Sequence, residues 1–543
     1  MKRFCIVVSI LCIVWSAASQ VNPEWSVVYN SPLAAGDFST AITTDKEGNV
    51  LVSGAGVNPA SNTTDGLVVK YNGDGDFQWA MVHSGSGNWD DAFNAIATDD
   101  EGNVYVTGFS DEGQTNKDFV TVMLRSGGVE VWKSYYRGLG SDDDDYATAI
   151  AVDKAGNVLV TGSSAGYSST NWTDFATIKY SPAGDTLWTA RAGGSGLPND
   201  RATALATDNS GYTYVTGYME GPVEVRYNYA TIKYTPYGDT AWLRIYNGSG
   251  SDEDRACAVA LDAARNVFVT GTSWGNGDDF ATLKYDSAGT LQWVARYNGP
   301  GNSSDKATGM VTDHAGNVYV TGYSAGTGFN YDYLTIKYNN EGDQEWVARY
   351  NGPDNYNDYA QSVAVDQHGN VFVTGYSENA PSPFISTTDV LTIKYNPLGE
   401  EQWIHRYNGQ GNYHDQGKAV TVAEDGSAYI AGRTDNYQQI NSSDVVILKF
   451  ADLNDADNGI IKPGDYIIYP NPAGNCFIFS LKSGTEEGII EIFSLTGEVV
   501  YCQSIRHQTD IQIDISSLTT GVYACLYKAD NRLPAIRKLV IAR

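Results

Sequence analysis

Short runs of alternating apolar and polar residues recur along most of the chain, and one pattern of two such runs returns eight times at a spacing of about 50 to 57 residues. Its copies are AITTDKEGNVLVSG (41–54), AIATDDEGNVYVTG (95–108), AIAVDKAGNVLVTG (149–162), ALATDNSGYTYVTG (204–217), AVALDAARNVFVTG (258–271), GMVTDHAGNVYVTG (309–322), SVAVDQHGNVFVTG (362–375) and AVTVAEDGSAYIAG (419–432). Alternation over so few residues is typical of strands, and Asp followed by Gly between the runs is typical of a tight turn. Each copy therefore predicts a strand, a turn and a second strand, and the eight copies predict a repeat protein.

Two further alternating runs follow each of the first seven copies. DFATIKY (174–180) is an example of the third run, and LQWVARYNG (291–299) is an example of the fourth. Four short strands per repeat, with no helical periodicity, are typical of a propeller blade. The expected fold class is therefore all-β, and eight copies predict an eight-bladed β-propeller.

A tryptophan marks the fourth run. These tryptophans are Trp25, Trp79, Trp132, Trp188, Trp242, Trp293, Trp346 and Trp403. Trp25 precedes every copy of the core, whereas the last copy ends at DVVILKF (444–450) with no tryptophan run after it. The N-terminal strand is therefore expected to complete the last blade and close the ring, which removes the open edges of a linear array.

Side chains at fixed repeat positions are expected to be structural. Large aromatic residues at one repeat position are typical of packing between blades, so the tryptophans are assigned to the inter-blade core. The lysine of the third run, such as Lys179 in DFATIKY, is expected to be exposed or to extend its ammonium group into solvent.

The first 19 residues predict a secretory signal peptide, because two basic residues precede an apolar run over residues 4–15 and small residues follow it. No other stretch approaches about 18 uninterrupted apolar residues, so no transmembrane segment is predicted. Four cysteines remain beyond this segment, namely Cys257, Cys476, Cys502 and Cys525. Free thiols and one disulfide among the last three both stay open, and no spacing indicates zinc.

The formal net charge of −29 is unevenly placed. Basic and acidic residues balance from residue 461 onward, so the repeats carry all of the net negative charge. Such a surface disfavours nucleic acid and anionic membranes, and it is compatible with divalent cations, neutral glycans or basic partners. Solubility outside the cell explains the same charge equally well.

The repeats end at a polar, Gly/Asp-rich linker over residues 452–465. Alternation and turn residues beyond it predict six or seven strands, enough for a small sandwich. The expected organisation is a signal peptide over residues 1–19, a propeller over 20–451, the linker over 452–465 and an Ig-like sandwich over 466–543.

Two family resemblances cover most of the chain. The pattern D-x-x-G-N-V-Y-V-T-G, followed by D-x-x-x-x-K-Y and G-D-x-x-W, resembles the SBBP family of bacterial β-propeller repeats over about residues 21–451. That family is usually described as seven-bladed, whereas eight copies are counted here. The resemblance brings no catalytic residues with it.

The tail resembles the C-terminal sorting domain of type IX secretion cargo. The elements that carry the resemblance are YPNP (469–472), SLTGEVV (494–500), IDISSLTTGVY (513–523) and KLVI (538–541). The resemblance implies the type IX secretion machinery as a partner, export across the outer membrane, and removal of the domain with surface attachment or release. The alternative is a small carbohydrate-binding or adhesive sandwich that stays attached.

Loop lengths distinguish the two faces of the expected propeller. The turns between first and second runs, and between third and fourth runs, have constant length, whereas connections between second and third runs vary from seven residues (272–278) to thirteen (376–388). Binding sites are typically placed where loops vary on a constant scaffold. This variable face, which also holds the starts of the first runs, is therefore the candidate functional surface.

Aspartates gather on the variable face. One precedes the first run in every repeat: Asp37, Asp91, Asp145, Asp200, Asp254, Asp305, Asp358 and Asp415. A second set begins the third run, with Asn228 in the one copy that lacks it. These aspartates either accept backbone N–H groups in their own turns and tie blades together, or form a ring of carboxylates able to hold Ca²⁺.

The stretch SDDDDYATAIAVD (141–153) is irregular, because its loop holds one residue more than its equivalents. Asp145 is the repeated residue, and Asp142, Asp143 and Asp144 belong to the preceding loop. This cluster is the candidate calcium site within a single loop. No other cofactor is indicated.

Tyrosines in the variable loops are candidates for stacking on sugar rings, among them Tyr323, Tyr331 and Tyr356. Packing explains them equally well in a tyrosine-rich chain. Enzyme signals are weak, since GYSAG (322–326) stands where a strand runs into a loop rather than into a helix, and the histidines show no metal-binding spacing.

The expected function is that of a secreted or cell-surface propeller that binds a glycan, a protein or a surface component. An extracellular hydrolase or lyase acting on polysaccharide is the first alternative, although no acid pair can be singled out among so many aspartates. A structural surface-layer protein is the second.

Overall fold

The computed structural model describes two compact units, Met1–Ala451 and Asp452–Arg543. Within residues 19–541 it describes every residue except 32–35, 59, 88, 113–115, 140–143, 167–171, 194–198, 222–225, 250–252, 276, 329, 383–384, 411–412, 436–442, 452–465, 470–475, 482–486, 495–498, 507–509 and 530–534.

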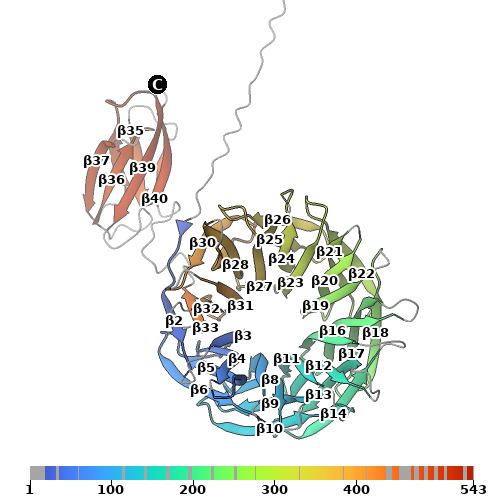
Figure 1. Cartoon of the computed structure of the whole chain (residues 1–543). Coiled ribbons are helices and arrows are strands. Elements are labelled where there is room, and N and C mark those ends of the chain that lie inside the picture. The colour runs from blue at the N-terminus through green and yellow to red at the C-terminus, as the bar shows by residue number, and fades with distance from the viewer. Residues whose placement is uncertain are drawn as a thin grey trace, which may run out of the picture. The chain divides into compact units, whose positions relative to one another are not determined.

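The first unit consists of antiparallel sheets arranged in a ring, and eight of them are present in its described residues (Figure 1). Blade 1 contains β3 (Asp37–Thr44), β4 (Val50–Asn58), β5 (Thr63–Tyr71) and β6 (Phe77–His83), and blade 2 contains β7 (Ala92–Thr98), β8 (Val104–Asp111), β9 (Lys117–Leu124) and β10 (Glu130–Tyr136). Blade 3 contains β11 (Tyr146–Val152), β12 (Val158–Ala165), β13 (Thr173–Tyr180) and β14 (Thr186–Ala192), and blade 4 contains β15 (Arg201–Thr207), β16 (Thr213–Glu220), β17 (Tyr227–Tyr234) and β18 (Thr240–Tyr246). Blade 5 contains β19 (Asp254–Leu261), β20 (Val267–Trp274), β21 (Asp278–Tyr285) and β22 (Leu291–Tyr297), and blade 6 contains β23 (Asp305–Thr312), β24 (Val318–Ala325), β25 (Tyr331–Tyr338) and β26 (Gln344–Tyr350). Blade 7 contains β27 (Asp358–Val365), β28 (Val371–Ser382), β29 (Ile385–Tyr395) and β30 (Glu401–Tyr407), and blade 8 contains β31 (Asp415–Val422), β32 (Ala428–Asp435), β33 (Ser443–Phe450) and β2 (Trp25–Tyr29).

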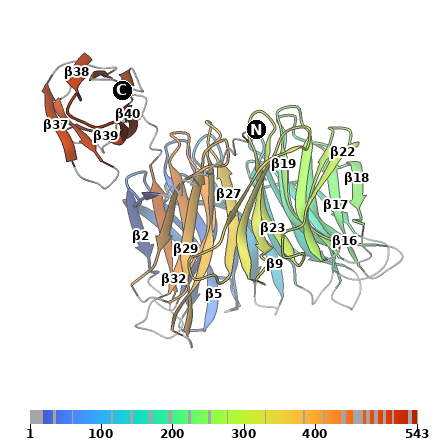
Figure 2. The same ribbon diagram turned by 90° about the horizontal axis from the view of Figure 1, so that it is seen from above.

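Blades 1 to 7 place their four strands in chain order from the inside of the ring outward, whereas blade 8 places β2 outside β31, β32 and β33. The all-β propeller prediction is confirmed. The first strand of every blade contacts the first strands of both neighbours, and β31 contacts β3. The second and third strands are buried on both faces, as the fully buried β12 illustrates, whereas the outer strands consist mostly of exposed and half-buried residues, as β14 illustrates. Figure 2 shows the strands running between the two faces of the ring.

The N-terminal strand closes the ring, as predicted. Strand β2 pairs antiparallel with β33, with Trp25 opposite Lys449, so residues from both ends of the repeat region form blade 8. The sequence did not predict β1 (Ser19–Gln20), which runs parallel to β30 and adds a short fifth strand to blade 7.

Tryptophan and lysine from one blade donate hydrogen bonds to the same carbonyl of the next blade. In blade 1, Trp79 Nε1 and Lys70 Nζ lie 2.9 and 3.2 Å from the Ser126 carbonyl oxygen, in the turn between β9 and β10. At the closure, Trp25 Nε1 and Lys449 Nζ lie 3.0 and 2.9 Å from the Gly73 carbonyl oxygen. The tryptophans therefore link neighbouring blades, as the sequence predicted.

The prediction of exposed or snorkelling lysines was wrong. Each of these lysines is less than a tenth exposed, namely Lys70, Lys179, Lys233, Lys284, Lys337, Lys394 and Lys449. Lys70 and Lys179 also form buried ion pairs with the turn aspartates Asp45 and Asp153, both at 2.8 Å. The Lys70 ammonium group is therefore satisfied inside the protein by the Asp45 carboxylate and the Ser126 carbonyl, which removes the need to reach solvent.

Glycine at the turn between the third and fourth strands makes room for the tryptophan. Gly75 has φ +87°, and a Cβ there would lie 2.9 Å from the Trp25 ring. Gly128 stands in the same relation to Trp79, at 2.6 Å. These positions need glycine both for backbone conformation and for the close approach of an aromatic ring.

The second unit has two sheets. One contains β34 (Tyr466–Tyr469), β35 (Cys476–Leu481) and β38 (Asp510–Asp514), and the other contains β37 (Val499–Arg506), β36 (Glu487–Phe493), β39 (Gly521–Ala529) and β40 (Ala535–Ile541). Apolar residues from both sheets, including Phe479, Ile513 and Tyr527, share one buried core. Cys257, Cys476, Cys502 and Cys525 are not joined in disulfides. In the described part of the chain, no helix is long and apolar enough to cross a membrane.

Replacement of Gly75 by alanine tests the contact between blades. Gly75→Ala should lower the thermal unfolding midpoint more than Gly48→Ala, by the equivalent of about 1–3 kcal/mol, because only the first substitution forces the Trp25 ring to move. Gly48 is the matched control, since its φ is +77° and nothing lies within 4 Å of its added Cβ. Equal shifts in the two variants would contradict a structural role for the tryptophan contact.

Candidate functional site

The repeated aspartates at the start of the first strands are buried and serve as backbone acceptors. Asp145 is typical: its Oδ2 accepts the Gly138 N–H at 2.6 Å, and its Oδ1 accepts the Ala165 N–H at 2.8 Å. The carboxylate thus joins the connection from the preceding blade to the end of the second strand. All eight are at most 2% exposed: Asp37, Asp91, Asp145, Asp200, Asp254, Asp305, Asp358 and Asp415. These bonds match the structural interpretation of the aspartates.

Burial raises the pKa of these carboxyl groups. The direction is the same for Asp37, Asp91, Asp145, Asp254, Asp305, Asp358 and Asp415. For Asp358, burial outweighs the hydrogen bonds from Ser377 and Gly352 and raises the pKa to about 6. Ionised Asp358 is therefore costly in the folded protein at neutral pH.

Arginines that the sequence analysis did not single out hold the second set of aspartates. Arg349 on β26 lies 2.8 Å from the Asp332 carboxylate and donates to Ser324 Oγ at 2.7 Å. Arg191 and Arg296 form the equivalent bonds in blades 3 and 5. A signal was present in the repeats, because the residue three positions after the tryptophan is arginine in blades 3, 5, 6 and 7.

The candidate calcium loop is described only in part. Asp142 and Asp143 lie outside the described residues. Asp144 is exposed and accepts hydrogen bonds from the Lys117 N–H at 3.0 Å and the Tyr146 hydroxyl at 2.8 Å. No group of three or more His, Cys, Asp or Glu side chains in the described residues is placed to hold a metal ion. Calcium binding here stays a prediction from the sequence.

Tyrosines from blades 6 and 7 form a cluster on the variable face. The Tyr323 ring lies 5.2 Å from Tyr331 and 4.9 Å from Tyr359, and Tyr359 lies 5.1 Å from Tyr376. All four side chains are half-buried. The structure thus brings together Tyr323, Tyr331 and Tyr376, which are loop tyrosines of the kind that the sequence offered as stacking candidates, with Tyr359, which was not among them.

Polar loop residues fix the surroundings of this tyrosine cluster. Asn357 Oδ1 accepts the Tyr331 N–H at 3.0 Å, and Asn357 Nδ2 donates to Glu378 Oε2 at 2.9 Å. Tyr356, the third predicted tyrosine, is 46% exposed, and its main-chain carbonyl accepts a hydrogen bond from Asn330 Nδ2 at 3.3 Å. Loops from both blades are therefore joined into one platform, with amide and carboxylate groups beside aromatic rings.

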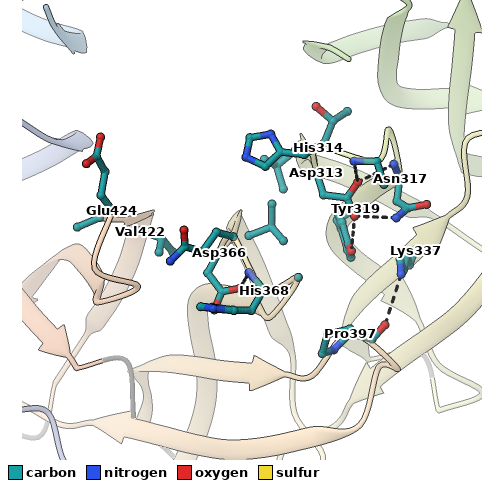
Figure 3. Close-up of a pocket in the computed structure, with 17 residues that line it drawn as sticks. Asp313, His314, Asn317, Tyr319, Lys337, Asp366, His368, Pro397, Val422 and Glu424 are labelled. Carbon is teal, nitrogen blue, oxygen red and sulfur yellow. Dashed lines mark hydrogen bonds between the residues drawn. The ribbon is translucent and has the colours of Figure 1, made fainter. Parts of the chain in front are cut away.

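Two hollows lie on the opposite face, among the turns of constant length. The larger, of about 800 Å³, is lined by turns of blades 6 to 8 and includes His314, His368 and Glu424 (Figure 3). Asp313 in its wall accepts hydrogen bonds from Asn317 Nδ2 at 2.7 Å and from the Tyr319 hydroxyl at 3.0 Å. A second hollow of about 750 Å³ has equivalent walls in blades 2 to 4. Their buried polar groups are engaged in the repeated scaffold, whereas the tyrosine cluster is peculiar to two blades.

Comparison with known families identifies both parts of the chain. Residues 132–168, 292–330 and 345–381 match the β-propeller repeat family, and residues 467–542 match the secretion system C-terminal sorting domain. The sorting domain indicates export by the type IX secretion system to the cell surface or the extracellular space, and it implies interaction with that machinery.

Curated relatives match over limited parts of their own length. An uncharacterized WD repeat-containing protein of Acanthamoeba polyphaga mimivirus is 24% identical over 476 residues, covering 75% of this chain and 30% of the viral protein. Regulatory protein FlaEY of Caulobacter vibrioides is 37% identical over 95 residues, covering 15% of this chain and 10% of that protein. The chain therefore spans less than a third of either relative.

Solved structures with similarity to the chain are distant. The β-propeller domain of the Trilobed protease from Pyrococcus furiosus has a TM-score of 0.40 at 8% identity, covering 67% of this chain and 96% of that domain. The extracellular domain of a putative hybrid two-component system from B. thetaiotaomicron has a TM-score of 0.34 at 12% identity, covering 93% of this chain and 72% of that chain.

The pH dependence of stability should differ in sign between two buried aspartates. The pKa of Asp358 is raised, so its contribution to stability is full below the unfolded value near ~4 and is lost as the pH rises through about 6. The pKa of Asp153 is lowered, because hydrogen bonds from Lys179 and Asn157 outweigh burial, so its contribution is present above ~4 and is lost as the pH falls.

Thermal unfolding of Asp358→Asn and Asp153→Asn at about pH 4.5 and about pH 7.5 checks this difference. Relative to the unmodified protein, Asp358→Asn should be more destabilising at the lower pH, by about 2 kcal/mol. Asp153→Asn should be more destabilising at the higher pH. The same sign of pH dependence in both variants would show that burial does not control the titration of Asp358.

Proposed function

We propose that this protein is a secreted or cell-surface β-propeller that binds carbohydrate through its variable face. The observation that carries the proposal is the cluster of Tyr323, Tyr331, Tyr359 and Tyr376 on blades 6 and 7. Half-buried aromatic rings offer a flat apolar face held by neighbouring packing, and such a face suits the C–H surface of a sugar ring.

The surroundings supply the polar half of the recognition. Burial raises the pKa of Tyr323, Tyr359 and Tyr376, so their hydroxyls stay protonated and can donate hydrogen bonds near neutral pH. The Asn357 amide and the Glu378 carboxylate lie in the same platform and suit sugar hydroxyls as partners. A few polar groups beside apolar rings are typical of small-ligand sites.

The charge of the chain favours a neutral glycan. A formal net charge of −29 repels polyanions at long range, although salt screens this effect beyond about 8–10 Å. Export to the cell surface or outside the cell places the variable face where polysaccharides occur, which fits the proposal.

Binding to a panel of immobilised neutral polysaccharides tests the proposal. Laminarin, xylan, galactomannan and pullulan are suitable probes, and at least one should bind the full-length protein. Tyr331→Ala and Tyr359→Ala should each weaken that binding about tenfold or more, because each removes part of the stacking platform.

Tyr237→Ala is the matched control. Tyr237 is 84% exposed and lies in the turn between β17 and β18, on the opposite face, so its removal should leave affinity unchanged. Thermal unfolding of each variant checks that the propeller is intact. Full binding by folded Tyr331→Ala and Tyr359→Ala proteins, or no binding to any glycan, would contradict the proposed function.

A further inference from the structure

The tyrosine cluster occupies repeat positions that can be followed around the ring. Three repeat positions come together where two blades meet on the variable face. The first blade supplies two of them, namely the residue after the V-T-G of its second strand and the residue before the repeated Asp or Asn of its third strand. The next blade supplies the third, which is the residue after its repeated Asp. At the seam between blades 6 and 7 these are Tyr323, Tyr331 and Tyr359. We call such a group a seam triad.

Two other seams hold aromatic triads. Between blades 4 and 5, the Tyr218 and Tyr227 rings lie 4.9 Å apart, and the Arg255 guanidinium lies 5.3 and 5.0 Å from their centres. The triad therefore has the same three positions as the tyrosine cluster, with a cation stacked in place of the third ring.

The seam between blades 2 and 3 repeats this arrangement. The Phe109 and Tyr146 rings lie 5.1 Å apart, and Lys117 Nζ lies 4.7 Å from the centre of Phe109 and 5.6 Å from that of Tyr146. The Tyr146 hydroxyl donates to Asp144 Oδ2, which fixes the orientation of the ring. At these three seams, where two or more triad positions hold a ring, the rings are half-buried on the variable face.

The other five seams hold at most one ring at these positions. Three triads have no ring: Ala55, Thr64 and Ala92 between blades 1 and 2; Ser163, Thr173 and Arg201 between blades 3 and 4; and Thr272, Asp278 and Lys306 between blades 5 and 6. Two triads have a single ring: Tyr376, Thr388 and Gln416 between blades 7 and 8; and Arg433, Ser443 and Phe38 between blades 8 and 1. The same scaffold therefore forms seams with and without aromatic triads, and the aromatic ones fall on every second seam from blade 2 to blade 7. Packing of the ring does not by itself require them.

The charges of the aromatic triads are balanced locally. Arg255 forms an ion pair with Glu253, and Lys117 Nζ lies 3.8 Å from Asp90. The cations thus support the rings without making a positive surface, which favours an uncharged ligand over an anionic one.

We propose that the variable face carries three equivalent subsites for a neutral polysaccharide, at the seams between blades 2 and 3, 4 and 5, and 6 and 7, and that one polymer chain engages more than one of them. This inference rests on the proposed function and extends it from one platform to an array. Sites joined on one rigid ring raise the effective concentration of a repeating ligand, so the polymer should bind far more tightly than a short fragment.

Calorimetry with a neutral polymer from the panel and with its trisaccharide tests the array, using the full-length protein. The double variant Tyr146→Ala/Tyr227→Ala removes a ring from two triads and leaves blades 6 and 7 unchanged. Its trisaccharide stoichiometry should fall from three to one at unchanged affinity for the remaining subsite, and its affinity for the polymer should fall at least about tenfold. A second variant, Tyr146→Leu/Tyr227→Leu, keeps apolar packing at both seams and should behave in the same way.

A trisaccharide stoichiometry of one in the unmodified protein and in both folded double variants, with unchanged polymer affinity, would overturn the array while leaving a single site at blades 6 and 7. Absence of binding by the unmodified protein would overturn the proposed function together with the array. Tighter binding of an anionic polymer, with alginate as the probe, than of any neutral one would overturn the assignment of ligand class.

Discussion

The structure of the propeller depends on one repeated contact, in which a tryptophan and a lysine of one blade donate to a single turn carbonyl of the next. Trp79 and Lys70 make this contact with Ser126, and Trp25 and Lys449 repeat it with Gly73 across the closure of the ring. The ends of the repeat region are therefore joined by the same chemistry that joins its interior blades. A buried lysine needs a carboxylate that neutralises its charge. In blades 1 and 3 the turn aspartate supplies this carboxylate by forming an ion pair with the lysine.

This contact lies on the face with turns of constant length. The loops and side chains of the other face can therefore differ between blades. On the variable face the repeated aspartates, such as Asp145, hold the strand connections through backbone N–H groups. The positions beside them carry no repeated side chain, and they range from alanine at Ala92 to tyrosine at Tyr359. A constant framework thus presents a set of changeable side chains, an arrangement that suits ligand recognition on a β-propeller.

Much of the fold could be predicted from the sequence because the repeat supplies the same signal many times. Eight copies of the core and the position of Trp25 before the first of them were enough to predict strands, blades and closure by the N-terminal strand. The strand β1 was not predicted, since two residues such as Ser19 and Gln20 carry no periodicity.

The side-chain environment was harder to predict, for physical reasons. Lys70 occupies a strand position with the usual alternation, but what covers it is the turn of another blade, which no pattern within its own blade reveals. Asp332 and Arg349 are likewise neighbours only after the third and fourth strands pair. Tyr323 and Tyr331 were candidates from their loops, whereas their contact with Tyr359 depends on the approach of the next blade.

The central claim is that ligands meet the variable face rather than the hollows among the constant turns. Hydrogen–deuterium exchange of the full-length protein, with and without a bound neutral polysaccharide, locates the contact directly. The account predicts slower exchange in the loops around Tyr331 and Asn357, with no change in the turns that hold His314 and His368. Protection confined to those turns would contradict it.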